Sequence, residues 1–450
     1  MGIHKYSYEN EYIVLDINSS NIFKCDKIMY DVLDHYPALS ESETVSHFKG
    51  SYPASAVSEA VADIDELILA GRLFTALPSG VLSESPRPGN LKALCLNVAH
   101  DCNLSCRYCF ASGGDFSLKK ELMSEETAKK AIDFLIASSG GRRNLEVDFF
   151  GGEPLLNFDV VKKTVSYARS LESTYGKHFR FTITTNAVLL DEDILEYFNE
   201  EMDNVVLSLD GRKEVNDKMR LTLNGKGSYN TVSEKISQAI EYRGSLNYYV
   251  RATYTALNTD FSEDVVHLSE LGAKNISAEP VVSDDPALAL GEEHLGLLKH
   301  EYDKLCSIML SREGKENAFS FFHFSIDTEN DTCIYKKLSG CGAGTEYAAA
   351  APDGDIYPCH QFVGKKEFRM GSVLDQTSDE SVSEKFRKVN SLNRKECSSC
   401  WARYFCGGGC FANAFSSSGS IDGIYRFGCE LLKKRLECAL YINSTKKTLY

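Results

Sequence analysis

Short apolar runs alternate with helical periodicity through the middle of the chain, from Leu91 to about residue 285. Six runs are predicted to be strands: Ala93–Val98, Leu145–Phe150, Phe179–Thr184, Val205–Leu209, Tyr248–Thr255 and Asn275–Ala278. Helical spacing between them is clearest in Ser124–Ile136, Asp191–Phe198, Thr231–Tyr242 and Phe261–Leu271. Repeated strand–helix units predict an α/β fold with a parallel sheet. The sheet is either doubly wound or a curved, incomplete barrel, because six units are too few for an eight-stranded one.

The segments on either side of this alternating region have different patterns. Residues 1–80 begin with the strand-like runs Tyr12–Ile17 and Asn21–Lys24, then show apolar stripes at helical spacing, and so predict a small winged-helix-like domain. Residues 81–92 read as a linker rich in serine and proline. The units that follow are an alternating domain at 93–300, a polar and mainly helical connector at 301–338, and a loop-rich, cysteine-rich domain at 339–450.

Composition and charge narrow the classes of function. The chain has 450 residues, 43% of them hydrophobic, which is enough apolar material for sizeable cores. With 49 basic and 64 acidic residues its formal net charge is −15, which argues against nucleic acid as a partner because phosphate binding needs a basic surface. No apolar run approaches the roughly 20 residues of a membrane span, and the N-terminus lacks a signal-peptide pattern. We therefore expect a cytoplasmic protein without membrane contact.

Fifteen cysteines are the unusual feature of this composition. An odd number leaves one thiol without a disulfide partner, and disulfide-dense domains are rarely this large. In a reducing compartment such thiols more often bind metals or act in catalysis. The cysteines that lie outside any cluster, and are expected to be structural, are Cys25, Cys95, Cys306 and Cys438.

Three cysteines cluster in the loop after the first strand of the alternating region: Cys102, Cys106 and Cys109. Active sites of α/β folds lie at this end of their strands. A structural metal site takes four ligands, whereas three thiolates on a four-iron cluster leave one iron open to another ligand. A zinc site completed by His100 is the alternative interpretation.

The Cys-x3-Cys-x2-Cys spacing in this place resembles the radical S-adenosylmethionine (SAM) superfamily. The resemblance implies a partial (β/α)6 barrel and a [4Fe-4S] cluster whose open iron binds SAM, which gives a 5′-deoxyadenosyl radical on reduction. Two further segments match the family's motifs, Gly151-Gly152-Glu153-Pro154 and Ser208-Leu209-Asp210-Gly211 with the later Arg220. The SAM contacts implied are Tyr108 near adenine, Gly151, Gly152 and Glu153 near the ammonium, Ser208 and Arg220 at the carboxylate, and Asn186 at the ribose or carboxylate.

A second group of cysteines lies near the C-terminus, with the spacing Cys397-x2-Cys400-x5-Cys406-x3-Cys410. Alone, this spacing suits a zinc ribbon about as well as an iron–sulfur site. Taken with the cysteines that flank it, the spacing resembles the SPASM domain, which holds two auxiliary [4Fe-4S] clusters. The resemblance implies an outer cluster held by Cys397, Cys400, Cys406 and Cys429, and an inner cluster held by Cys341, Cys359 and Cys410.

The fourth ligand of the inner cluster is left open by this pattern. Cys333, seven residues before Cys341, is one candidate. The other, which we favour, is a cysteine thiolate of the substrate, because a soft thiolate suits an open iron. Sulfatase-maturing relatives place a catalytic Asp directly after the cysteine that corresponds to Cys359, whereas this chain has His360 there. His360 is thus a candidate general base or donor, although a supporting role beside the cluster is favoured.

The combined motifs resemble a SPASM-containing radical SAM maturase of ribosomally made peptides, most like the thioether-forming SCIFF and sactipeptide enzymes. The resemblance implies a thioether synthase that joins a substrate cysteine to an acceptor residue, with threonine favoured, in a precursor peptide. The N-terminal domain would bind the peptide's leader as an added strand at a sheet edge near Tyr12–Ile17 or Asn21–Lys24. The implied cofactors are SAM and three [4Fe-4S] clusters, with an electron donor such as flavodoxin or ferredoxin.

Other functions share parts of this pattern. A radical SAM peptide oxidase or a carbon–carbon crosslinking enzyme would carry every motif, and so would an enzyme with sulfatase-maturase chemistry. A zinc-ribbon binding protein without catalysis would need only the C-terminal spacing.

Overall fold

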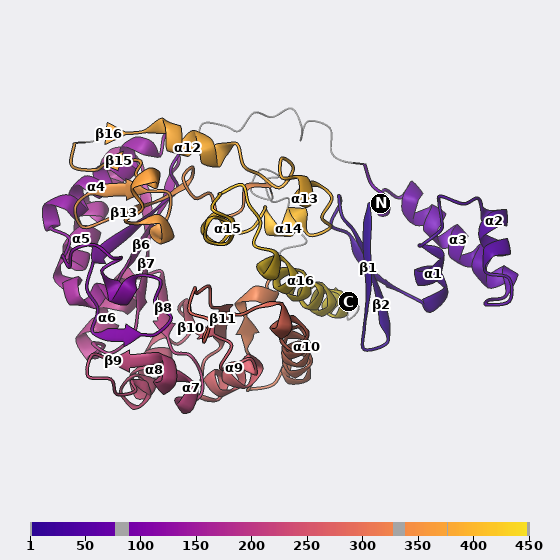
Figure 1. Ribbon diagram of the computed structural model, residues 1–450, viewed down its shortest axis with the longest axis horizontal. Helices are drawn as coiled ribbons and strands as arrows, with labels where there is room; N and C mark the ends of the chain where they lie inside the picture. The colour runs from indigo at the N-terminus through magenta and orange to yellow at the C-terminus, as the bar shows by residue number, and fades with distance from the viewer. Residues whose placement is uncertain (1, 77–89, 327–337, 376, 448–450) are drawn as a thin grey trace.

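The main body of the protein is built on one sheet of eleven strands, seen in a computed structural model that describes residues 2–76, 90–326, 338–375 and 377–447. The strands follow the order β12-β11-β10-β8-β7-β6-β4-β13-β14-β15-β16. In Figure 1 they trace an open arc, with the helices of the alternating region on its outer side. The helices cover one side of the arc, so the sheet is an incomplete barrel and not a doubly wound sheet.

All six predicted strands of the alternating region are present and run parallel to one another. They are β4 (Ala93–Ala99), β6 (Asn144–Gly151), β7 (His178–Thr185), β8 (Asn204–Ser208), β10 (Tyr248–Tyr254) and β11 (Asn275–Pro280). Burial alternates along β6, β7, β8 and β10. One face therefore packs on the outer helices, while the other is free to line a cavity.

The four predicted helices are confirmed as α4 (Glu125–Ser138), α6 (Glu192–Glu201), α8 (Tyr229–Arg243) and α9 (Phe261–Glu270). Ser124 caps α4 as expected, because its hydroxyl accepts a 3.0 Å hydrogen bond from the Thr127 amide. Helices α5 (Phe158–Tyr175) and α7 (Lys213–Met219) and the short pair β5 (Leu104–Cys106) and β9 (Arg220–Thr222) complete this region.

Strands from the cysteine-rich part of the chain continue the same sheet. β13 (Tyr347–Ala350) pairs in parallel with β4, and β14 (Asp355–Tyr357) returns beside it through a turn in which Gly354 has a φ of 87°. The sheet ends with β15 (Gly371–Ser372) and β16 (Thr377–Ser378), and at its opposite edge with β12 (Ser320–Phe321). The predicted boundary at residue 339 thus lies between segments that share one hydrogen-bonded sheet.

The C-terminal region is more helical than its sequence pattern indicated. Four short helices precede a helix of 22 residues, α16 (Arg426–Lys447), which lies against α10 (Leu295–Arg312) (Figure 1). The short ones are α12 (Glu380–Arg387), α13 (Lys395–Ser398), α14 (Arg403–Cys406) and α15 (Phe411–Ser418). Among the helices of the described ranges, none combines the length and apolar composition of a membrane span.

The N-terminal unit is a three-stranded antiparallel sheet followed by three helices. The order is β1 (Ile3–Tyr8), β2 (Glu11–Asp16), β3 (Ile22–Cys25), α1 (Lys27–Val32), α2 (Glu41–His47) and α3 (Ala54–Leu69). The sheet packs between these helices and α16, as Figure 1 shows.

Strand β1 was not predicted from the sequence, and its presence corrects the expected sheet edge. β2 pairs with β1 on one side and with β3 on the other. The expectation that Tyr12–Ile17 forms a free edge is therefore wrong, because both sides of that strand are already hydrogen-bonded. β3, which overlaps the second candidate segment, is an edge strand.

Candidate functional site

A cavity of about 420 Å³ opens at the carboxyl ends of the parallel strands. The residues predicted to hold the first cluster and SAM all line it, and they are Cys102, Cys106, Tyr108, Cys109, Gly151, Gly152, Glu153, Asn186, Ser208 and Arg220. His360 and Cys410 of the cysteine-rich region line the same cavity. The fold therefore gathers seven separate chain segments around one space, as expected for this end of a parallel sheet.

The cysteine loop is held in place by the β5–β9 ribbon. Its register places Cys106 opposite Arg220, so the ribbon fixes a cation beside the thiols. Burial raises the pKa of Cys102 to about 12 and that of Cys106 to about 11, while the Arg220 charge opposes the rise at Cys106. These thiols are neutral alone and lose their protons when metal binds.

Two glycines of the Gly151-Gly152 segment allow two loops to touch. Gly151 has a φ of 130°, and a Cβ there would clash with the carbonyl oxygen of Ala99. A Cβ on Gly152 would clash with the carbonyl oxygen of Asp101. The Gly152 and Glu153 amides donate to those same two carbonyls, at 2.7 and 2.9 Å. The glycines are needed here for packing against the cysteine loop.

Glu153 is buried and its carboxylate is engaged by the protein. It accepts hydrogen bonds from the Thr185 hydroxyl (2.7 Å), the Asn186 amide (2.8 Å) and the Leu155 amide (3.1 Å). Burial raises the pKa of Glu153 to about 6, although these donors oppose the rise. Glu153 thus ties the end of β7 to the glycine loop, while contact with a SAM ammonium stays a prediction.

Tyr108, Asp210 and Arg220 form a buried triad on the cavity wall. The Tyr108 hydroxyl donates to Asp210 Oδ2 at 2.7 Å and accepts from Arg220 Nη1 at 2.8 Å, and Arg220 Nη1 lies 3.8 Å from Asp210 Oδ1. Asp210 had been given no role of its own. Burial raises its pKa, and the Arg220 charge and Tyr108 hydrogen bond oppose that rise. The triad holds the guanidinium of Arg220 at the cavity, while its contact with a SAM carboxylate stays a prediction.

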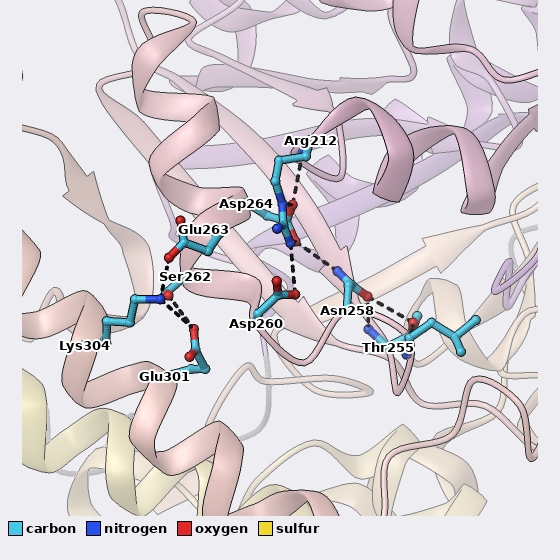
Figure 2. A network of polar contacts seen from close by, with 10 residues as sticks. Arg212, Thr255, Asn258, Asp260, Ser262, Glu263, Asp264, Glu301 and Lys304 are labelled. Atoms are coloured by element: carbon cyan, nitrogen blue, oxygen red, sulfur yellow. Dashed lines mark hydrogen bonds and ion pairs between the residues drawn. The ribbon is translucent and has the colours of Figure 1, made fainter.

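A polar network behind the cavity positions the loop that carries Asp210 (Figure 2). Arg212 donates from Nε to Asp264 Oδ1 at 2.8 Å, and its Nη2 lies 2.9 Å from Asp260 Oδ1. Asn258 donates to Asp264 Oδ2 at 3.2 Å and accepts from the Thr255 amide at 2.8 Å. These contacts join the loops after β8 and β10 to the start of α9.

The cysteines predicted for the inner cluster are grouped beside the cavity. Burial raises the pKa of Cys359 to about 12, and the neighbouring thiols Cys410 and Cys341 add to the rise. Cys410 itself lines the cavity. Cys333, the alternative fourth ligand, lies outside the described residues.

The cysteines predicted for the outer cluster form a third group. Cys397, Cys400 and Cys429 line a second cavity of about 520 Å³. Burial raises the pKa of Cys406 to about 12, and the neighbouring thiols of Cys429, Cys397 and Cys400 add to the rise. The fold thus divides the C-terminal thiols into the two sets that the resemblance implied, although their binding of clusters stays a prediction.

The arrangement of the thiols suits iron–sulfur clusters. Within the described ranges, no three Cys, His, Asp or Glu side chains are placed to hold one metal ion. A four-iron cluster holds its cysteine sulfurs further apart than one zinc ion does. His100 packs on the Phe116 ring with centroids 4.9 Å apart, and burial lowers its pKa to about 4. The three groups of cysteines would suit three clusters held by thiolates, while the ring of His100 packs against Phe116.

His360 faces the cavity from the cysteine-rich side. Its ring lies 5.0 Å from that of Phe150 and 5.7 Å from that of Phe110, and Nδ1 is 3.3 Å from the Tyr347 hydroxyl. Burial, aided by the Arg251 charge, lowers its pKa to about 4. The imidazole is neutral at neutral pH and packs near the cavity-lining rings of Phe110 and Phe150.

Sequence reasoning missed several residues of this cavity. They are Phe110, Arg251, Thr253, Glu279, Gln361 and Asn413. Arg251 and Thr253 share β10, and the others lie on different segments, but none of them belongs to a motif with a recognisable spacing. For Arg251 and Glu279, the sequence offers one signal: each is a charged residue on a predicted strand of the parallel sheet.

Comparisons with known proteins agree with this geometry. Residues 96–271 match the family model described as the Radical SAM superfamily, and residues 341–401 match one described as an iron-sulfur cluster-binding domain, SPASM. An uncharacterised protein of Methanocaldococcus jannaschii is 33% identical over 218 residues, covering 48% of this chain and 70% of that protein. A serine-type anaerobic sulfatase-maturating enzyme of Klebsiella aerogenes is 25% identical, covering 79% of this chain and 88% of that enzyme.

Solved structures share the fold. The enzyme anSMEcpe, solved with AdoMet and the Kp18Cys peptide, has a TM-score of 0.64 at 20% identity, covering 79% of this chain and 99% of that one. Streptococcus suis SuiB, solved with its precursor peptide SuiA, has a TM-score of 0.55 at 17% identity and covers 94% of this chain and 97% of its own. The chain therefore belongs to the radical SAM superfamily, as an enzyme that uses SAM and a [4Fe-4S] cluster and carries auxiliary iron–sulfur clusters in a C-terminal SPASM domain.

Proposed function

We propose that this enzyme installs thioether crosslinks in a ribosomally made precursor peptide. Each crosslink would join a cysteine to an acceptor residue, for which threonine is the favoured candidate. One observation carries the proposal: Cys410, of the inner thiol set, lines the same cavity as Cys102, Cys106 and Cys109. A substrate cysteine held at the inner cluster would lie beside the site of radical formation. Family membership itself excludes the zinc-ribbon binding protein without catalysis.

The protein's own residues would prepare this reaction. When bound, SAM would supply the 5′-deoxyadenosyl radical, the species that takes a hydrogen atom from the acceptor carbon. The triad of Tyr108, Asp210 and Arg220 fixes a cation for the SAM carboxylate. Phe110 and Phe150 add an apolar surface to the cavity lining, which would limit water near the radical.

Peptide capture would involve the N-terminal sheet. β3 (Ile22–Cys25) is an edge strand to which a leader could add by main-chain hydrogen bonds. SuiB, whose structure covers 94% of this chain, was solved with its precursor peptide, which supports a peptide substrate here. We propose that the enzyme works in the cytoplasm with flavodoxin or ferredoxin as electron donor.

Mass spectrometry of a precursor peptide encoded beside this enzyme tests the proposal. After anaerobic incubation with reconstituted enzyme, reductant and SAM, we expect a loss of two hydrogens per crosslink and one cysteine that no longer reacts with an alkylating reagent. The control is the variant with Cys102, Cys106 and Cys109 all replaced by alanine, which should yield unmodified peptide.

The outcomes separate the rival chemistries. A loss of two hydrogens with every cysteine still open to alkylation would show a carbon–carbon crosslink or an oxidation, and would reject thioether formation. Formylglycine in place of a cysteine or serine would show the chemistry of the sulfatase-maturating relatives. Iron analysis should give about 12 irons per chain, from three four-iron clusters.

A further inference from the structure

The charged side chains that line the main cavity are two arginines and two glutamates, and three of them have partners. Arg220 is held by Tyr108 and lies near Asp210, and Glu153 accepts from donors around β7. Glu279 Oε1 lies 3.0 Å from His323 Nε2, and its Oε2 lies 3.7 Å from Arg435 Nη1. The fourth, Arg251, makes no side-chain hydrogen bond or ion pair with any described residue.

The position of Arg251 gives its charge access to the cavity. It lies on β10, which is paired on both sides, and its chain neighbours Val250 and Ala252 are only 1% and 2% exposed. Arg251 is nevertheless exposed, because its side chain enters the cavity. The strand register places it beside Ser208 on β8, one of the predicted SAM contacts.

The positive charge of Arg251 acts on Glu279, which lines the same cavity. Burial alone would raise the pKa of Glu279, but His323, Arg435 and Arg251 together lower it to about 2. Glu279 contacts His323 and Arg435, whereas Arg251 makes no direct hydrogen bond or ion pair with it, so the guanidinium donors of Arg251 are available to a ligand.

We propose that Arg251 binds a carboxylate that a ligand brings into this cavity. A guanidinium presents a planar fork of donors that matches the two oxygens of a carboxylate. A ligand that fills the cavity would shield such a pair from water, and the pair would then be stronger than one on the open surface. The carboxylate has two possible sources, the methionine part of SAM and an acidic group of the substrate.

Equilibrium binding to the full, reconstituted enzyme tests the first source. The variants are Arg251→Gln, Arg251→Lys and, as a matched control, Arg143→Gln, whose exposed side chain precedes β6 at the far end of the sheet. The ligands are SAM and decarboxylated SAM. If SAM is the source, Arg251→Gln should weaken SAM binding about tenfold, the difference of one charge-assisted hydrogen bond, and leave decarboxylated SAM unaffected. Arg251→Lys should recover part of the loss.

The second possible source, an acidic group of the substrate peptide, rests on the proposed function and is tested by a separate binding experiment. Binding of the precursor peptide is compared with that of a peptide in which every Asp and Glu is replaced by Asn or Gln. If the substrate is the source, Arg251→Gln weakens only the acidic peptide and SAM binding stays unchanged. If no precursor binds the wild-type enzyme, the proposed function fails and SAM binding alone decides the role of Arg251. Affinities within twofold of wild type for every ligand that binds would overturn this role for Arg251.

Discussion

At the scale of single residues, the chemistry of Tyr108 differs from what its place in the cysteine loop suggested. It was expected to contact adenine through its ring. In the structure its hydroxyl also joins two buried charges, Arg220 and Asp210. A hydrogen bond to a buried charged group contributes more than one between neutral groups. The hydroxyl is therefore a positioning group for Arg220.

Replacing Tyr108 by phenylalanine should weaken SAM binding by roughly five- to tenfold, because Arg220 loses the hydroxyl that fixes it. The ring remains, so any stacking with adenine is kept. Equilibrium binding of SAM to the reconstituted variant measures the effect, and iron content should stay at the wild-type value.

Tyr167→Phe is the matched control, because Tyr167 makes a similar 2.9 Å bond to Asp133 on the outer helices, away from the cavity. Wild-type affinity in Tyr108→Phe, or an equal loss in both variants, would show that the hydroxyl of Tyr108 does not position Arg220.

At the scale of elements, α16 holds the body of the enzyme together. Arg435 on this helix donates to the Tyr302 hydroxyl on α10 at 2.7 Å, and Tyr302 lies 2.7 Å from the Tyr254 hydroxyl on β10. The buried thiols Cys306 and Cys438 are neighbours at the same helix contact, which agrees with their expected structural role. Arg435 also lies 3.7 Å from Glu279, so this network reaches a residue that lines the main cavity.

Arg435→Met should lower the stability of the enzyme by about 3 kcal/mol, because it leaves Glu279 with one cationic partner fewer and Tyr302 without its donor. Differential scanning fluorimetry of the reconstituted enzyme should show a clearly lower unfolding temperature. Arg143→Met, at an exposed site, should leave it unchanged.

An unchanged unfolding temperature in Arg435→Met would mean that the helix is held by its apolar contacts alone. Since Glu279 is held at a pKa of about 2 in the folded state, its ion pairs stabilise the fold above the ordinary glutamate pKa and are lost as pH falls towards 2. The difference between wild type and Arg435→Met should therefore shrink at low pH.

At the scale of the whole molecule, the N-terminal unit is docked on the outer-cluster region. The rings of His4 on β1 and Trp401 stack with centroids 3.8 Å apart and planes 2° apart, and Trp401 directly follows Cys400. Arg403 donates to Asn18 at 2.9 Å at the same contact. The predicted leader-binding unit and the outer thiol set therefore share an interface.

His4→Ala should loosen this interface, because it removes the stack on Trp401 and the 3.2 Å contact with Glu437. We expect amide exchange in β1 to accelerate by about three- to tenfold, as one aromatic pair contributes about 1 kcal/mol. Hydrogen–deuterium exchange with mass spectrometry measures it, with β7 as the internal reference.

His47→Ala provides the comparison, since His47 contacts His35 and Phe48 within the N-terminal helices. It should leave exchange in β1 at the wild-type rate. Equal exchange of β1 in His4→Ala and wild type would show that the remaining contacts of Tyr6 and Tyr8 hold the unit in place.

The sequence by itself determined the repeating strands and helices of the alternating region and the two places in the chain where cysteines cluster. The six parallel strands and the cap at Ser124 were predictable because periodicity and capping act over a few residues. The cysteine spacings were equally local. The common end of parallel strands then places Cys102, Gly151, Asn186 and Ser208 around one space without further information.

Only the tertiary structure decided which distant segments meet. β1 was missed, and β13 joined the main sheet, because strand pairing depends on partners far apart in the chain. For the same reason no sequence pattern indicates that Asp210 holds Tyr108, or that Glu279 has side-chain partners while Arg251 has none among the described residues. The charge available to a ligand is what remains after every tertiary contact is made, so it is a property of the fold and not of any motif.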